Sequence, residues 1–333
     1  MSETPSGPAH PPVVAVLGAG PAGLSAGLWL RNLGFAPWLI ESQPKPGGMQ
    51  NLNFLPNDWV LGQDGLTGPQ LVERFVAHAA QFGVRPIVGC RVVEISGRAG
   101  AFALRYAPAD GAVEQVACAA LLIATGTRYR GAEVLAATPG AAAVPAGRIF
   151  YGPYAFADLA GCAGRRVLVV GGGDNAYENV RLLAERGARI DLVLRSPPRA
   201  QRHLRERVDA AAAAGACRIH AAARIAGLGW DAQGIAVVLH SGAGTQALTA
   251  DRIHVLAGYE PDTGFLAALD GDLRAALHRD AQGYLSVDAQ CRTGAAGIYA
   301  AGDICNPAFP SVVSAVAQGA QAAKTIELDL RAG

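Results

Sequence analysis

The sequence lacks three features: a long apolar run, a strong net charge and paired cysteines. Its 333 residues contain no run of about 18 uncharged apolar residues, so we expect no membrane-spanning helix. The formal net charge is +1, and no nucleic-acid partner is expected from so balanced a chain. Met1–Pro12 has no basic segment followed by an apolar one. We therefore expect a flexible tail over residues 1–10, rather than a signal peptide, in a cytoplasmic protein.

The six cysteines are scattered and form neither a CxxC pair nor a metal-like spacing. They are Cys90, Cys118, Cys162, Cys217, Cys291 and Cys305. We interpret them as free thiols in a reducing compartment, and we predict no metal site. The histidines form no arrangement from which a catalytic residue can be derived, so no catalytic side chain is predicted.

Apolar residues and glycine are plentiful. Hydrophobic residues make up 51% of the chain, charged residues 17%, and there are 42 glycines. A chain of this length and composition is expected to form about two globular domains, each with its own core.

The first glycine-rich motif, GAGPAG, follows the short apolar run Val13–Leu17. Such a run is typical of a strand buried on both faces. In the motif, Gly18 allows a tight turn, Gly20 lets the backbone approach a pyrophosphate, and Gly23 lets the next helix pack closely. A second strand, PWLI, ends at Glu41, whose carboxylate is placed to accept hydrogen bonds from an adenosine ribose. This order predicts a dinucleotide site.

The same pattern recurs in the middle of the chain. Residues 167–170 (VLVV) predict a strand, Gly171 and Gly173 predict the turn, and Ala176 takes the third small position. A helical segment and a second strand, IDLVL, follow. The repetition predicts a second dinucleotide site.

The second pattern ends in arginine instead of an acid. IDLVL is followed by Arg195 and then by Arg199. An acid would favour the free ribose hydroxyl of NADH, whereas arginine pairs with the 2′-phosphate of NADPH. We therefore predict a preference for NADPH, with NADH possible. The arginines from Arg202 onward are interpreted as a solvated helix start.

Two dinucleotide patterns in one chain indicate FAD in the first and a nicotinamide dinucleotide in the second, with hydride passing between them. Parallel βαβ units predict helices on both faces of each sheet. We predict an α/β fold of two Rossmann-like, three-layer dinucleotide-binding domains, the second inserted in the first. The FAD-binding domain comprises residues 11–128 and 254–333, and the NAD(P)H-binding domain comprises residues 129–253.

Over nearly its full length the chain resembles the low-molecular-weight thioredoxin reductase branch of the FAD-dependent pyridine-nucleotide oxidoreductases. PGGMQ resembles the family segment that runs under the flavin. LLIATGT and GYEPDT resemble the places where the chain leaves and re-enters the FAD domain. GIYAAGDIC resembles the second FAD signature, in which Asp303 binds the ribitol chain. The helix beginning near Ser311 is expected to point its N–H groups at the flavin.

The resemblance implies cofactor sites drawn from the whole chain, and it implies a homodimer. The residues expected to contact FAD are Gly18, Gly20, Pro21, Ala22, Gly23, Glu41, Gly48, Met49, Gln50, Ala124, Thr125, Gly126, Gly302, Asp303, Ser311 and Val312. Those expected to contact NADPH are Gly171, Gly173, Asp174, Asn175, Ala176, Arg195 and Arg199.

One element of that branch is missing. Thioredoxin reductases carry a CxxC disulfide just before the second glycine loop, and it passes electrons from the flavin to thioredoxin. Here the region has the sequence RIFYGPYAFADLAGCAGRR, in which Cys162 is the only cysteine. Tyr151 and Tyr154 stand approximately where the pair would be. We therefore expect no thioredoxin reductase activity.

The segment FADLAGCAGRRVLVVGGGDNA resembles CxxC-free relatives, the thioredoxin-reductase-like ferredoxin/flavodoxin–NADP⁺ reductases. Their C-terminal segment, which covers the flavin with an aromatic side chain, has no counterpart after TIELDLRAG. We predict an NAD(P)H oxidoreductase whose flavin reduces a small redox acceptor, such as a quinone or oxygen, or a ferredoxin/flavodoxin-type protein. The alternative is a flavin-binding sensor or scaffold with little or no turnover.

Overall fold

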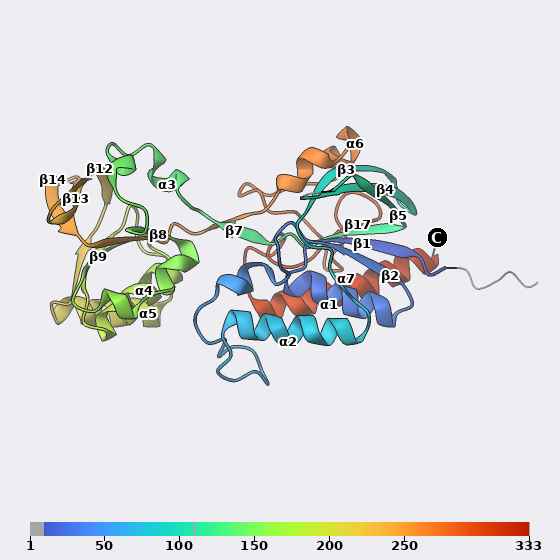
Figure 1. The fold of residues 1–333 in the computed structure, drawn as a ribbon, viewed down its shortest axis with the longest axis horizontal. Coiled ribbons are helices and arrows are strands. Elements are labelled where there is room, and N and C mark those ends of the chain that lie inside the picture. Colours follow the sequence, from blue (N-terminus) through green and yellow to red (C-terminus); the bar gives the residue numbers. More distant parts are fainter. Residues whose placement is uncertain (1–9, 110, 333) are drawn as a thin grey trace, which may run out of the picture. The chain divides into compact units, whose positions relative to one another are not determined.

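The computed structural model describes residues 10–109 and 111–332, which form two compact units (Figure 1). Unit 1 combines the chain up to Arg128 with the chain from Glu260 onward, and unit 2 comprises Tyr129–Tyr259. The chain crosses between them in two paired strands, β7 (Thr127–Tyr129) and β16 (Tyr259–Pro261). The predicted tail, apart from its last residue, lies outside the described residues.

Unit 1 is built on a four-stranded parallel sheet with the order β17-β6-β1-β2. Its strands are β1 (Val13–Leu17), β2 (Ala36–Ile40), β6 (Ala120–Ile123) and β17 (Ile298–Ala300). Three helices cover one face (Figure 1): α1 (Pro21–Asn32), α2 (Gly68–Gln81) and α7 (Val312–Ala332). An antiparallel sheet covers the other: β3 (Cys90–Arg98), β4 (Ala101–Pro108) and β5 (Glu114–Cys118).

The two faces of β1 pack against these different layers. Val14 and Val16 are buried in one core with α1 and α7, whereas Ala15 and Leu17 are buried in another with Phe102 of β4. Successive side chains of a strand point to opposite faces, so a continuous apolar run suits a central strand covered on both sides. The expected double burial of this strand is confirmed.

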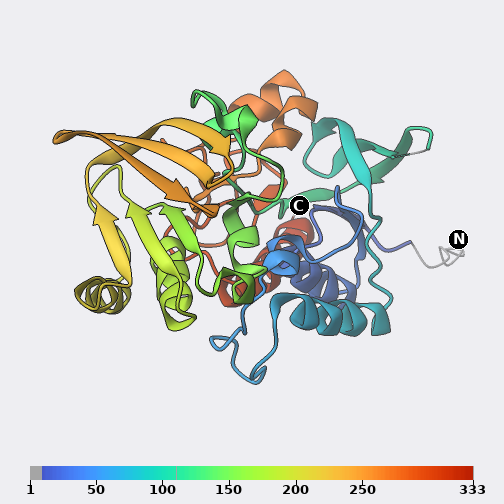
Figure 2. The same ribbon diagram turned by 60° about the vertical axis from the view of Figure 1, so that its left-hand side comes forward.

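Unit 2 repeats the plan around a five-stranded parallel sheet with the order β11-β10-β9-β15-β8. Its strands are β8 (Ile149–Tyr151), β9 (Arg166–Val170), β10 (Arg189–Val193), β11 (Cys217–His220) and β15 (Arg252–Val255). Helices α4 (Asp174–Glu185) and α5 (Arg202–Ala213) lie on one face. The other carries an antiparallel sheet, gold to orange in Figure 2: β12 (Ala223–Asp231), β13 (Gly234–Ser241) and β14 (Gly244–Ala250).

The three-layer α/β fold is therefore confirmed, but the expectation of helices on both faces of each sheet is wrong. In each unit a three-stranded antiparallel sheet takes the second face. The segment AFALRYAP shows why, because Phe102, Leu104 and Tyr106 are buried at every second position, which is the period of a strand.

The second crossing also lies later than the expected boundary at residue 254. β15 pairs in parallel with both β8 and β9, so residues 254–259 belong to unit 2. A short strand such as RIHV, with Ile253 and Val255 buried, fits either parallel sheet, and only the pairing decides between them.

The remaining elements are short. They are α3 (Glu133–Ala136), α6 (Gly271–Ala276), η1 (Gly48–Leu52), η2 (Ala141–Ala143), η3 (Gly152–Phe156), η4 (Ala160–Cys162) and η5 (Gly264–Ala268). Within the described ranges, no helix combines the length and apolar character needed to cross a membrane.

Candidate functional site

The carboxyl ends of the four parallel strands bring the predicted FAD residues of unit 1 together. Gly18–Gly23 follow β1 and Glu41 follows β2, while Ala124–Gly126 follow β6 and Gly302 and Asp303 follow β17. Because the strands are parallel, these segments share one edge of the sheet. Ligands of open α/β sheets bind at this edge.

The glycines of the first loop differ in what requires them. A Cβ at Gly18, where φ is 101°, would lie 2.4 Å from the Ala124 carbonyl oxygen. A Cβ at Gly23 would lie 2.0 Å from the Gly18 carbonyl oxygen. At Gly20 the nearest atom would be the Cα of Gly48, 4.0 Å away. Packing of the chain therefore explains the first and last glycines, whereas the middle one leaves space that a ligand can fill.

Helix α1 begins at this space without a side-chain cap. Gly20 is its N-cap residue, Pro21 lies in its first turn, and that turn holds no acidic residue. The first N–H groups of a helix lack intrahelical partners and carry the positive end of the helix dipole. The turn at Pro21 and Ala22 therefore presents an electropositive backbone to an anion such as a pyrophosphate.

Glu41 is held against the same loop. Its side chain is 5% exposed, and its Oε2 accepts a hydrogen bond from the Ala19 N–H at 2.8 Å. Its Oε1 accepts from the Gln43 N–H, also at 2.8 Å. Oε1 also accepts from the Ser42 hydroxyl at 3.4 Å, whereas Oε2 keeps a further lone pair, so the fixed group can still accept from a ribose hydroxyl.

Two buried oxygens of unit 1, Gln50 Oε1 and Asp303 Oδ1, have no hydrogen-bond partner within the described chain. Buried polar atoms in native proteins are almost always paired. Burial raises the pKa of Asp303 to about 6, partly offset by the backbone N–H of Ser311. Both oxygens can accept a hydrogen bond that no group of the described chain donates. The hydroxyl groups of a ribitol chain and the ring N–H of a flavin are donors of the kind that would satisfy them. These residues fit FAD.

The other predicted FAD residues adjoin this loop or support it. A Cβ at Gly302 would lie 2.9 Å from the Cβ of Ala22, which places the β17 segment directly against α1. Thr125 donates its hydroxyl to the Asp262 carbonyl oxygen at 2.8 Å. This hydrogen bond joins the segment just before β7 to the segment just after β16. Four more residues lie in or beside these segments: Met49 in η1, Gly126 after Thr125, and Ser311 and Val312 at the start of α7.

The raised pKa of Asp303 predicts that FAD affinity depends on pH. Donors on the ligand stabilise the ionised carboxylate, so proton binding and FAD binding oppose each other. Affinity is expected to fall about tenfold for each pH unit below about 6. The folding stability of the flavin-free protein changes with pH in the opposite direction. It falls as pH rises through about 6, because the buried carboxyl group of Asp303 then becomes charged.

Titration of FAD into apoprotein across this pH range measures the effect. An Asp303→Asn variant is the control and should bind FAD more weakly with a flat profile between about pH 5 and 7. A wild-type profile equally flat would show that the carboxylate does not contact the cofactor.

The second glycine loop, after β9, shows the same division of roles. A Cβ at Gly171 would lie 2.2 Å from the Leu256 carbonyl oxygen and 3.1 Å from the Cβ of the fully buried Ala176. At Gly173, the uncapped N-cap residue of α4, a Cβ would meet nothing within 4 Å. Gly173, which corresponds to Gly20 of the first loop, again leaves space beside a helix N-terminus.

The segment after β10 is held against this loop. Arg199 donates its backbone N–H to the Gly172 carbonyl oxygen at 2.8 Å. Asp174 accepts from the backbone N–H and the side-chain Nε2 of Gln201, at 2.8 and 2.9 Å. Asn175 donates to the Tyr259 hydroxyl at 3.3 Å. Asp174 thus positions the arginine-bearing segment, and its direct contact with a nucleotide stays a prediction.

Arg195 lies in a pocket of about 300 Å³ that the sequence did not reveal. Arg224, His240 and Ser241 line it with Arg195. Arg224 and His240 belong to the antiparallel sheet of unit 2, far from Arg195 along the chain. No motif links them, and only the strand pairing brings them together. Arg199 is not among the lining residues.

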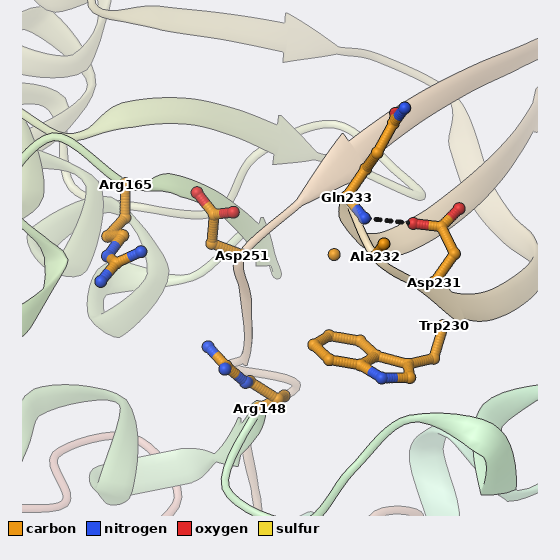
Figure 3. Close-up of a pocket in the computed structure, with 8 residues that line it drawn as sticks. Arg148, Arg165, Trp230, Asp231, Ala232, Gln233 and Asp251 are labelled. Carbon is orange, nitrogen blue, oxygen red and sulfur yellow. Dashed lines mark hydrogen bonds between the residues drawn. The ribbon is translucent and has the colours of Figure 1, made fainter.

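A larger pocket, of about 480 Å³, lies at the opposite edge of the same sheet (Figure 3). Its residues Arg148, Arg165 and Asp251 stand just before β8, β9 and β15. The Arg148 guanidinium lies over the Trp230 ring, 5.3 Å from its centroid. These are amino ends of parallel strands, so the pocket is not the nucleotide site of this sheet.

The cysteines of the chain are unpaired and mostly buried. All six cysteines lie among the described residues and all are free. Cys162 is fully buried and donates to the Asp158 carbonyl oxygen at 3.4 Å. Burial raises the pKa of five thiols: Cys118, Cys162, Cys217, Cys291 and Cys305. A reactive thiol needs a lowered pKa, and none of these five has one; four of them are also buried, while Cys305 is partly exposed.

The two tyrosines ahead of the second loop pack within unit 2. Tyr151 borders the core of this unit, and the ring of Tyr154 meets that of Tyr129 edge-on at 6.0 Å. Gly152 is required here, because a Cβ would lie 2.6 Å from the Tyr129 ring. In the described parts of the chain, no group of three or more His, Cys, Asp or Glu residues is placed to hold a metal ion.

Comparison with known proteins agrees with this geometry. A family model described as pyridine nucleotide-disulphide oxidoreductase matches residues 12–319. A glucosaminate ammonia-lyase from Pseudomonas fluorescens is 28% identical, over 94% of each chain. A ferredoxin–NADP reductase from Salinispora tropica is 31% identical, over 89% of this chain and 86% of its own. The crystal structure of T. acidophilum thioredoxin reductase shares the fold, with a TM-score of 0.78, 22% identity and coverage of 97% and 100%.

Proposed function

The chain belongs to the pyridine nucleotide-disulphide oxidoreductase family, and from this membership we propose a specific electron path. FAD and NADPH are the cofactors of this family and of its ferredoxin–NADP reductases. We propose that NADPH reduces FAD and that the flavin then passes electrons directly to an external acceptor, without a disulfide. The observation that carries the proposal is the pair of glycine loops, each with a middle glycine that no protein packing explains.

The residues of the chain bind and orient the reactants. FAD, when bound, would supply the redox chemistry of hydride acceptance and electron release. In unit 1, α1, Glu41 and Asp303 would hold its pyrophosphate, ribose and ribitol groups. In unit 2, α4 and Arg195 would hold the nucleotide. Hydride transfer needs no acid or base from the protein, so positioning would be the main contribution of these residues.

A ferredoxin-type protein or a small acceptor such as a quinone is the proposed destination of the electrons. The Salinispora tropica relative, named ferredoxin–NADP reductase, supports the protein acceptor. A homodimer in the cytoplasm is part of the same proposal, and sedimentation of the purified protein tests its oligomeric state.

Turnover is expected to be independent of thiols. A Cys162→Ser variant should reduce a dye with NADPH as fast as the wild type, since the buried thiol has no cysteine partner and a serine can keep the hydrogen bond to Asp158. The measurement is steady-state dye reduction, with thermal unfolding as the check on folding. Loss of most turnover in a folded variant, or a thiolate-to-flavin charge-transfer band, would contradict the disulfide-free path.

Anaerobic mixing with NADPH tests the function as a whole. Complete bleaching of the flavin is expected, followed by reoxidation with ferredoxin, flavodoxin, a quinone, a disulfide or oxygen added in turn. The fastest acceptor identifies the class of partner. A flavin that neither NADPH nor NADH bleaches would refute the enzyme and favour the sensor or scaffold.

A further inference from the structure

The pocket around Arg195 is built from both sheets of unit 2. Arg195 follows β10, and the turn after β11 lies beside it, because the Leu194 N–H donates to the His220 carbonyl oxygen at 3.0 Å. The Ala223 N–H donates back to the Leu194 carbonyl oxygen at 2.9 Å. These two bonds hold the end of β11 and the start of β12 against Leu194, the residue after β10. The pocket therefore lies at the carboxyl edge of the parallel sheet, where its nucleotide binds.

The strand register brings two basic residues to the same place. Arg224 of β12 and His240 of β13 are directly opposite partners in the antiparallel ladder, and Ala223 is opposite Ser241. Opposite residues of an antiparallel pair project from the same face, with Cβ atoms about 5 Å apart. Arg224 and His240 therefore line one wall of the pocket together, and Arg195 lines it from the parallel sheet.

The positive charge of this pocket is not neutralised from within the chain. Neither Arg195 nor Arg224 forms an ion pair with any carboxylate of the described residues. Other arginines of unit 2 are paired: Arg166 with Asp251 at 2.6 Å, and Arg252 with Asp158 at 2.9 Å. Two unpaired guanidinium groups, an imidazole and a hydroxyl around about 300 Å³ suit a compact anion with several acceptor oxygens.

On the basis of the proposed function, we propose that Arg224 and His240 join Arg195 in binding the 2′-phosphate of NADPH. The residue after the second strand of such a fold faces the 2′ position of the adenosine ribose, which puts Arg195 at the phosphate. The neighbouring wall then supplies Arg224 as the second guanidinium and His240 as a further donor. Arg199, which the sequence pairs with Arg195, is not among the lining residues, and its contact with the phosphate stays a prediction.

Binding of adenosine 2′,5′-bisphosphate and of 5′-AMP to purified protein, measured by calorimetry, tests the proposal without turnover. Arg224→Gln is expected to weaken the bisphosphate by about 10- to 100-fold, as for loss of a charge-assisted phosphate contact, and to leave 5′-AMP unchanged. His240→Gln should weaken binding of the bisphosphate by about two- to tenfold. Arg224→Lys keeps the positive charge but not the planar set of guanidinium N–H donors. Its affinity for the bisphosphate should lie between those of the wild type and Arg224→Gln.

The matched control is Arg189→Gln. Arg189 is an exposed arginine at the other end of β10, and the variant should bind both nucleotides like the wild type. Thermal unfolding verifies that each variant is folded. The proposal is wrong if folded Arg224→Gln and His240→Gln bind the bisphosphate as tightly as the wild type while Arg195→Gln loses it.

Flavin reduction separates this proposal from the function on which it rests. If the wild type reduces its flavin, Arg224→Gln should lose NADPH efficiency by the same factor and keep its NADH efficiency. If neither nucleotide bleaches the flavin but Arg224→Gln still loses the bisphosphate, the proposed function fails and the phosphate site stands. Equal affinity of the wild type for the bisphosphate and 5′-AMP would refute the site even if NADPH reduces the flavin.

Discussion

Replacing Gly20 with valine is expected to yield a folded protein without FAD. Gly20 has φ of −72° and ψ of −174°, a conformation that valine adopts without strain, and no described protein atom lies closer than 4.0 Å to the position of its Cβ. The valine side chain would fill the space through which a pyrophosphate reaches the N-terminus of α1. We expect FAD affinity to fall by about 100-fold or more, since the anion loses several N–H contacts together.

Reconstitution of the apoprotein with FAD, followed by its visible spectrum, measures this loss. Gly271→Val is the control, because Gly271 also has an ordinary backbone conformation and nothing within 4 Å of its Cβ position. That variant should stay yellow. Gly18→Val should instead lower the unfolding temperature, since its Cβ would strike the Ala124 carbonyl oxygen. Normal FAD content in Gly20→Val would remove the main support for the first cofactor site.

Replacing Gly173 with valine is expected to leave FAD in place and to abolish reduction by both NADPH and NADH. Gly173 is the N-cap of α4, with φ of −98°, ψ of −179° and no described atom within 4 Å of its Cβ position. A side chain there would block the pyrophosphate that the two nucleotides share. The rate of flavin reduction should fall by about 100-fold or more, whereas a variant of Arg195 should affect NADPH alone.

Anaerobic stopped-flow mixing of the variant with each nucleotide gives these rates. Reduction by dithionite is the control, because a chemical reductant needs no nucleotide site and should bleach the variant and the wild type alike. Wild-type reduction rates with NADPH in Gly173→Val would place the nicotinamide nucleotide elsewhere. Loss of FAD from this variant would contradict the assignment of one loop to each cofactor.

These two predictions rest on motifs that are local in the chain. β1 and β2 have nearly the predicted bounds. Glu41, which follows PWLI, accepts a hydrogen bond from the first loop, as its position in the sequence indicates. Such features depend on strand period, glycine conformation and helix dipole within about thirty residues, and the order of residues carries all of these. Two predictions failed where sequence alone was ambiguous. The second layer on each sheet is antiparallel β, and the strand around residue 254 joins unit 2.

The amino-acid sequence by itself determined the two dinucleotide folds and the absence of a CxxC pair. It also predicted that Gly20 of the first loop lets a pyrophosphate approach the backbone. Only the tertiary structure decided that Asp303 Oδ1 and Gln50 Oε1 are buried without partners, and that Arg195 shares a pocket with Arg224 and His240. Burial and charge clustering depend on which distant strands become neighbours. That choice is made by packing over the whole chain, because a shift of one residue in the β12–β13 register would separate Arg224 from His240.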